Sequence, residues 1–200
     1  MIVGHYASAL VSRTHLPRAP LWLLLLCAQL PEFLWLALAL AGIEAPRPGS
    51  ILDATFQNIQ VDMIYSHNLI PNLVLGLATS AVVRLIWRDW SLALWCGALV
   101  VVHVLCDYLV GFQHQLLGRF SPDIALNLYA RMPYLAILIE LCFAATCVLY
   151  YAVHERRSGR AASKGTLIEL CAVFLIGILM WMPSATLSLR QMLHMSGFLD

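Results

Sequence analysis

Five apolar stretches, each long enough to cross a lipid bilayer as a helix, constrain this chain more than any other feature of its sequence. They cover residues 21–43, 68–87, 91–110, 133–153 and 166–183. A helix needs about 20 mostly apolar residues to cross the hydrocarbon core. Proline and glycine residues in the connecting segments mark the breaks between them. We therefore expect an all-α integral membrane protein, with residues 1–200 forming one polytopic domain, a bundle of about five transmembrane helices.

Composition supports this class and excludes others. Hydrophobic residues make up 61% of the chain and charged residues 12%, whereas soluble domains average about 25% charged residues. The net charge of +1 and the lack of a basic patch with interleaved aromatic residues exclude a nucleic-acid-binding surface. The six cysteines form no C-x-x-C pair, so we expect them to be small buried apolar residues.

The basic residues predict an orientation. Of the 12 Lys and Arg residues, eight fall on one side of the expected bundle: Arg13, Arg18, Arg84, Arg88, Arg156, Arg157, Arg160 and Lys164. Cytoplasmic loops carry the excess of basic residues, so we expect a cytoplasmic N-terminus and a bacterial inner (plasma) membrane location. The first residues lack the basic region that opens a signal peptide. They are apolar enough, over 1–11, to form a short half-helix that dips into the bilayer.

Ionisable residues inside the spans or at their edges need a reason to be there, because a charge near the bilayer centre costs at least about 2.5–3.5 kcal/mol. Such residues are Glu32, His67, His103, Asp107 and Glu140. With the expected topology, they come from four spans and approach one depth. Two histidines and three carboxylates at one level indicate a metal site or a proton relay. The structural alternatives are acids hydrogen-bonded to a neighbouring helix and an interfacial His67.

Two local patterns sharpen this expectation. His103 and Asp107 are four residues apart, so they share one helix face and can bind one metal ion, orient one another for catalysis, or form a structural hydrogen bond. His114 continues this face if the helix extends beyond Gly111. In the first span, Pro31 should bend the helix beside Glu32 and free a backbone carbonyl.

Several short motifs resemble a known family. They are Gly4-His5, then AQLPEFLW and AGIE in the first span, YSHNL at the start of the second span, and HVLCDYLV in the third. In this order and spacing the sequence resembles the YdjM-like superfamily of predicted membrane-bound metal-dependent hydrolases, over the first three spans and more loosely the fourth. The resemblance implies that metal or catalytic positions are His5, Glu32, His67, His103, Asp107 and Glu140.

The chain departs from the family pattern in places. Glu32 stands where the family usually has Asp, Asn68 follows His67 where Ser is more usual, and the segment after Asp107 differs. His5 also conflicts with the expected topology. That topology places His67, His103 and Asp107 in the outer half of the bundle, far from a cytoplasmic N-terminus unless the site is deep.

These observations predict a metal-dependent hydrolase that acts on a lipid or another membrane-resident ester or phosphoester. His67, His103, Asp107 and His5 are the predicted ligands of a divalent ion, zinc or manganese, and Glu32 and Glu140 are the predicted catalytic carboxylates. The alternatives are a proton- or cation-coupled transporter and a non-catalytic scaffold in which the polar residues bond helices together. The expected partners are the lipid bilayer and a lipid substrate, and the sequence leaves the oligomeric state open.

Overall fold

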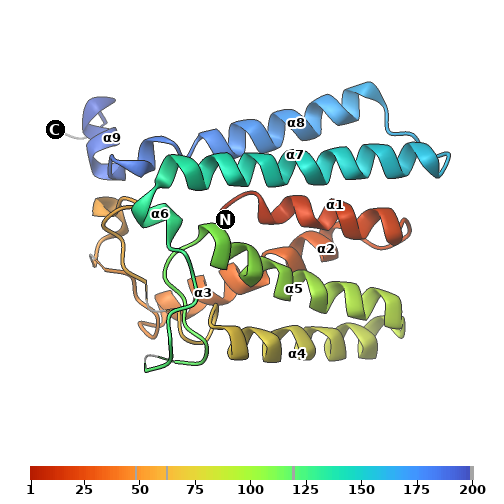
Figure 1. Cartoon of the computed structure of the whole chain (residues 1–200), viewed down its shortest axis with the longest axis horizontal. Coiled ribbons are helices and arrows are strands. Elements are labelled where there is room, and N and C mark those ends of the chain that lie inside the picture. The colour runs from red at the N-terminus through yellow and green to blue at the C-terminus, as the bar shows by residue number, and fades with distance from the viewer. Residues whose placement is uncertain (48, 62, 119, 199–200) are drawn as a thin grey trace.

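The computed structural model describes residues 1–47, 49–61, 63–118 and 120–198, and Figure 1 shows the path of the chain. Over these residues the regular structure is helical, with no β-strand. The helices are α1 His5–His15, α2 Leu21–Ala28, α3 Leu30–Leu40, α4 Leu69–Trp87, α5 Trp90–Val110, α6 Leu128–Arg131, α7 Pro133–Arg157, α8 Lys164–Leu179 and α9 Leu189–Met195. Short 3₁₀ turns cover Ile51–Asp53 and Pro183–Ala185.

The number of spans agrees with the sequence prediction. Four helices are long and apolar enough to cross a bilayer: α4, α5, α7, and α8 together with the turn that continues it to Ala185. The pair α2 and α3 is long and apolar enough only when taken together, as a fifth, broken span or a re-entrant loop, and is bent by 57°. Their ends lie close to the expected bounds, except that α7 continues to Arg157. The all-α architecture of the prediction is confirmed.

The bend between α2 and α3 has a local cause. Pro31 has no N–H to donate and its ring clashes with the preceding turn, so a helix breaks next to it. Here the chain leaves the helix at Gln29 and resumes at Leu30. The predicted bend is therefore confirmed, and the carbonyl oxygen of Ala28 is left to accept a hydrogen bond from another helix, at His103.

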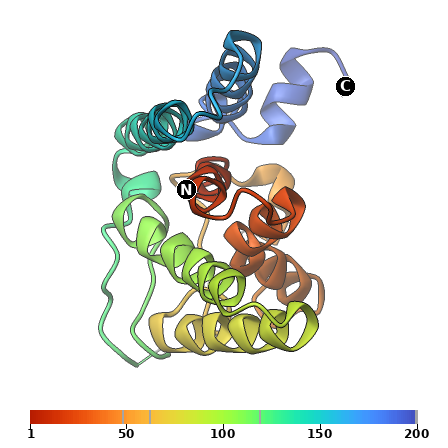
Figure 2. The ribbon, with the colours of Figure 1, turned by 90° about the vertical axis from the view of Figure 1, so that its right-hand side faces the viewer.

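Helix α1 lies inside the bundle, packed against α7, α2 and α5 (Figures 1 and 2). Its buried face carries small residues, Ala7, Ser8, Ala9 and Ser12, which let neighbouring backbones approach closely. The hydroxyl of Ser8 is satisfied within the helix by the carbonyl of His5. A short N-terminal helix is thus present as predicted, but it covers His5–His15 and not residues 1–11, and its first turn lies in the interior.

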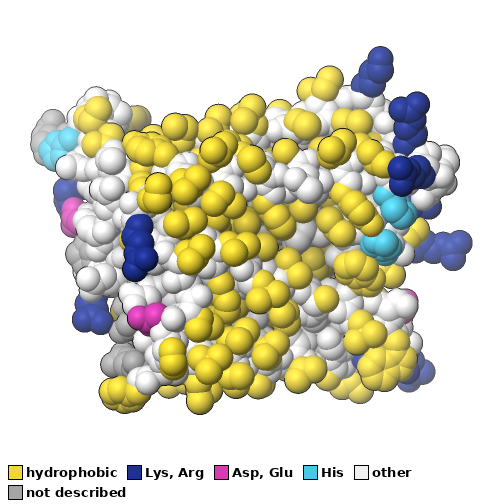
Figure 3. Space-filling model, in the orientation of Figure 1, with side chains coloured by type: hydrophobic (Ala, Val, Ile, Leu, Met, Phe, Trp, Pro, Cys, Tyr) yellow, Lys and Arg dark blue, Asp and Glu magenta, His cyan; other side chains and the backbone are white. Residues whose placement is uncertain are grey.

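The outer surface has the pattern of a protein in lipid. Hydrophobic side chains cover the middle of the face in Figure 3, and Lys and Arg gather toward the ends, chiefly the one where α7 turns into α8. The α1–α2 and α4–α5 turns lie at the same end (Figure 1). Of the six cysteines, four are buried as expected, but Cys142 and Cys171 are exposed on outward faces of α7 and α8.

Candidate metal centre

The predicted cluster comes together around one carboxylate, that of Asp107 on α5. Its Oδ2 lies 3.4 Å from Nε2 of His103 and 3.5 Å from Nε2 of His67. The two Nε2 atoms lie 3.3 Å apart. These three atoms come from α5 and from the segment just before α4, and all three side chains are nearly fully buried.

Glu32 approaches the same place from the bent span. Its Oε2 lies 3.5 Å from Nε2 of His67, and its side chain is 29% exposed, against 7% for Asp107. Glu32, His67 and His103 form one group of potential metal ligands. The bend next to Pro31 turns this stretch toward α5, so the break in the helix positions the carboxylate. Glu32 is the most exposed of these acidic and histidine side chains.

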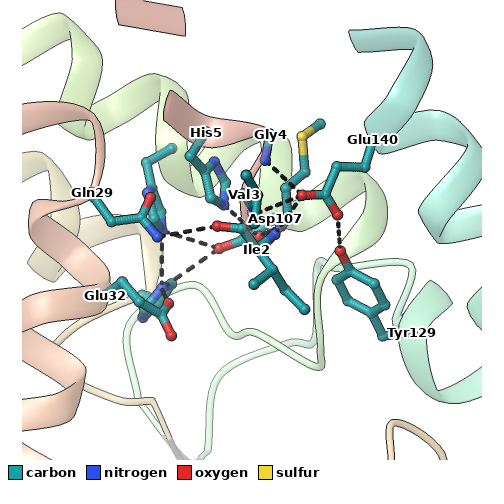
Figure 4. Close-up of polar contacts among 12 residues, drawn as sticks. Ile2, Val3, Gly4, His5, Gln29, Glu32, Asp107, Tyr129 and Glu140 are labelled. Carbon is teal, nitrogen blue, oxygen red and sulfur yellow. Dashed lines mark hydrogen bonds and ion pairs between the residues drawn. The ribbon is translucent and has the colours of Figure 1, made fainter. Parts of the chain in front are cut away.

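His5 reaches the cluster, although the expected topology placed it far away. Its Nε2 lies 3.1 Å from Oδ1 of Asp107, and its ring stacks on His103 with centroids 3.6 Å apart. His5, His103 and Asp107 form a second group of potential ligands. Two of its members, His103 and Asp107, also form the triangle with His67 described above. The conflict in the prediction is resolved because α1 begins deep inside the bundle (Figure 4).

The hydrogen bonds at the far side of each ring fix which nitrogen carries the proton. His103 Nδ1 lies 2.7 Å from the carbonyl oxygen of Ala28, which can only accept, so Nδ1 carries the hydrogen. His67 Nδ1 lies 2.9 Å from the hydroxyl of Ser66, whose own hydrogen goes to Glu44 at 2.7 Å. Nδ1 of His67 must therefore donate too. In the neutral rings, both Nε2 atoms point unprotonated lone pairs into the cluster.

Two facing lone pairs repel each other unless a cation lies between them. Ligating histidines in proteins almost always donate their other N–H to a carbonyl, a carboxylate or another polar group, as both rings do here. A metal with bonds of about 2.1 Å sets its tetrahedral ligand atoms about 3.4 Å apart. The triangle of His67, His103 and Asp107 has edges of 3.3, 3.4 and 3.5 Å, so these residues fit a small divalent ion.

Glu140 lies near this cluster but is engaged elsewhere. Its Oε1 accepts the backbone N–H groups of Ile2, Val3 and Gly4 at 2.9, 2.7 and 2.6 Å, and its Oε2 accepts the hydroxyl of Tyr129 (Figure 4). Glu140 belongs to neither group of potential ligands. Four donors satisfy this acid, so it anchors the segment that leads into His5, and its use as a catalytic base stays a prediction.

His114 joins the cluster by a route that the sequence did not suggest. Helix α5 ends at Val110, so His114 lies in a loop and does not continue the face of Asp107. The loop folds back, and the ring of His114 stacks on that of His67 with centroids 5.3 Å apart. Burial lowers the pKa of His114 to about 3, so this ring is neutral at physiological pH.

Sequence reasoning missed Glu44 and Ser66 as members of the site. Glu44 is nearly fully buried although it follows the end of α3 in a connecting segment, and Ser66 is buried beside His67. Both lie in motifs noted above, AGIE and YSHNL, but nothing in their spacing indicates a hydrogen bond across 22 positions. Gln29, which is buried between α2 and α3, donates to the carbonyl of Ile2 at 3.2 Å.

Comparisons of this chain with protein-family models, with curated proteins and with solved structures find no match. Membership of the YdjM-like superfamily therefore stays a prediction from the motifs. The case for a function depends on the geometry of the site.

Proposed function

We propose that this chain is a membrane-embedded, metal-dependent hydrolase. The observation that carries the proposal is the pair of histidine Nε2 atoms 3.3 Å apart, with both Nδ1 atoms committed as donors. A purely structural pair of histidines would share a hydrogen between facing nitrogens. While both rings are neutral, neither nitrogen here has one to share, and Oδ2 of Asp107 lies on the same side.

The donor set favours zinc, with manganese as the second choice. Imidazole nitrogens and carboxylate oxygens suit zinc, and the separations match its tetrahedral geometry. His67, His103 and Asp107 would hold the ion, and His5 would donate to Oδ1 of Asp107 and orient it. A bound zinc ion lowers the pKa of its water to about 7 and polarises an ester or phosphoryl oxygen.

Glu32 is the best placed general base. Its carboxylate lies beside His67 and is the acid of the cluster with an exposed side, so it can take a proton from a water molecule and pass it out. Glu140 has no free acceptor position of comparable quality, because four donors already occupy its oxygens. Of the two catalytic carboxylates predicted from the sequence, Glu32 and not Glu140 would therefore carry out the proton transfer.

The place of the site indicates the class of substrate. The cluster is enclosed by helices long and apolar enough to cross a bilayer, and Glu32 lies at the bend of one such span. A lipid or other membrane-resident ester or phosphoester could reach this partly exposed acid without leaving the bilayer. We place the basic end in the cytoplasm, in a plasma (bacterial inner) membrane, because positive residues favour that side.

Metal content of the detergent-purified protein tests the proposal. We expect about one zinc or manganese per chain in the wild type, and loss of that metal in His103→Ala and Asp107→Ala. Leu109→Ala, on the exposed side of α5, is the matched control and should keep the metal. Hydrolysis of lipid esters should then follow the metal content. A wild type that takes up no zinc, manganese or magnesium would rule the proposal out, and bound metal with ion flux into liposomes but no hydrolysis would favour a transporter.

A further inference from the structure

Glu44 and Ser66 form a hydrogen-bonded chain that ends on a proposed metal ligand. Oε1 of Glu44 accepts the backbone N–H groups of Tyr65 at 2.5 Å and Ser66 at 3.3 Å. Its Oε2 accepts the hydroxyl of Ser66 at 2.7 Å, and that hydroxyl lies 2.9 Å from Nδ1 of His67. Glu44, Ser66 and His67 are each at most 1% exposed.

The direction of this chain follows from the hydrogen-bonding chemistry of an ionised Glu44. A carboxylate can only accept hydrogen bonds, so the single hydrogen of the Ser66 hydroxyl goes to Glu44. The hydroxyl oxygen then has only lone pairs left for His67, and Nδ1 of His67 must be the donor. The charge on Glu44 thus selects, through Ser66, the form of His67 whose Nε2 is free to bind a metal.

A purely structural role for Glu44 is a real alternative, because its two backbone hydrogen bonds also join the segment after α3 to the turn before α4. The structural role and the tautomer-selecting role of Glu44 make different demands on one atom, Oε2. An anchor needs only an acceptor for the backbone N–H groups, and an amide oxygen provides that. Selection of the His67 tautomer needs an acceptor, and not a donor, at the position of Oε2.

We propose that Glu44 is a positioning residue that acts through Ser66 to hold His67 in its metal-binding tautomer. This rests on the proposed metal site, but the tautomer itself can be measured without any metal. In Glu44→Gln, the amide oxygen keeps the backbone bonds while the NH₂ group donates to Ser66. The hydroxyl then turns to donate to Nδ1 of His67, and the ring proton moves to Nε2, where it blocks ligation.

The experiment uses ¹⁵N-histidine-labelled full-length protein in detergent, without metal, because the chain has only seven histidines to assign. The nitrogen shifts distinguish a protonated ring nitrogen from a lone pair, and loss of signals in His67→Asn assigns the ring. We expect the wild type to carry its proton on Nδ1 and Glu44→Gln to carry it on Nε2. Zinc affinity should fall about 10- to 100-fold in Glu44→Gln.

A second pair of variants leaves Glu44 in place, in case Glu44→Gln does not fold. Ser66→Thr keeps the hydroxyl and should keep both the wild-type tautomer and the zinc affinity. Ser66→Ala removes the hydroxyl and should weaken zinc binding at least about 10-fold.

The outcomes separate the two proposals. An unchanged tautomer and unchanged zinc affinity in Glu44→Gln, or in Ser66→Ala, would overturn the role of Glu44 while the metal site stands. If the tautomer of His67 changes as expected in Glu44→Gln but the wild type never binds metal, the role of Glu44 in the hydrogen-bonded chain is supported and the proposed hydrolase is ruled out.

Discussion

Asp107 and Glu140 are both nearly fully buried acids in the spans of one bundle, yet the structure gives them opposite surroundings. Glu140 receives four hydrogen bonds, three from backbone N–H groups and one from Tyr129. Oδ1 of Asp107 accepts the N-terminal ammonium of Met1 and lies beside His5, whereas its Oδ2 faces two imidazole nitrogens whose Nδ1 hydrogens are committed elsewhere. Every oxygen of Glu140 is thus occupied by hydrogen-bond donors, while one oxygen of Asp107 faces ring nitrogens that could bind a cation.

The largest expected effect comes from changing these two acids in the same way. Asp107→Asn keeps the shape but removes the charge, and should weaken zinc binding by at least about 100-fold. Glu140→Gln keeps an oxygen for the backbone N–H groups, should retain zinc within about 10-fold, and should lower the free energy of unfolding by about 1.5–3 kcal/mol, the usual strength of hydrogen bonds to charged groups. Zinc titration and denaturant unfolding of both variants measure these effects. Equal loss of zinc in the two would mean that both acids belong to one ligand set.

A smaller effect is expected where the chain passes closest to Glu140. A Cβ atom on Gly4 would lie 2.7 Å from Cγ of Glu140, so Gly4→Ala must push the segment before α1 away from the Glu140 side chain. Overpacking of this kind costs about 1–3 kcal/mol, which thermal unfolding would register. Gly118→Ala is the control, because its Cβ would meet nothing within 4 Å. If both variants melt together with the wild type, Glu140 does not fix the segment before His5.

The smallest effect is expected for an acid on the surface. Asp53 pairs with Arg190 at 2.6 Å, and this hydrogen bond lowers the pKa of Asp53 below its ordinary value. The sign follows from the direction: the stabilisation is present above the ordinary pKa and is lost as the pH falls through the lowered one. Asp53→Asn should therefore melt only slightly below the wild type at neutral pH, and together with it in acid or high salt. A drop as large as that of Glu140→Gln would contradict the contrast between interior and surface acids.

The parts of this molecule that follow from local rules were predictable. Apolar length predicted the spans, Pro31 predicted the bend, and the cost of burying charge predicted that Glu32, His67, His103 and Asp107 would converge. His5 was identified by resemblance, although its position conflicted with the expected topology. That conflict came from placing the N-terminus in the cytoplasm, whereas α1 begins deep in the bundle.

The parts that depend on distant partners were not predictable. The burial of Glu44 and the return of His114 to His67 arise where connecting segments fold back onto the bundle, and the four donors on Glu140 come from the N-terminal segment and from α6. Such segments carry no periodic pattern, and hydrogen bonds between residues far apart in sequence leave no spacing to detect. The proton positions on His67 and His103 also depend on partners distant in the sequence, which are Glu44 through Ser66 for His67 and the carbonyl of Ala28 for His103.

The bend at Pro31 has one more consequence. The two facing histidines are oriented by different kinds of partner: His67 by side chains, and His103 by the main-chain oxygen of Ala28. Every residue has a carbonyl, so replacing the side chain at position 28 cannot delete that partner. The orientation of His103 is therefore insensitive to most point substitutions there, but sensitive to any insertion or deletion that shifts the break in the helix by one residue.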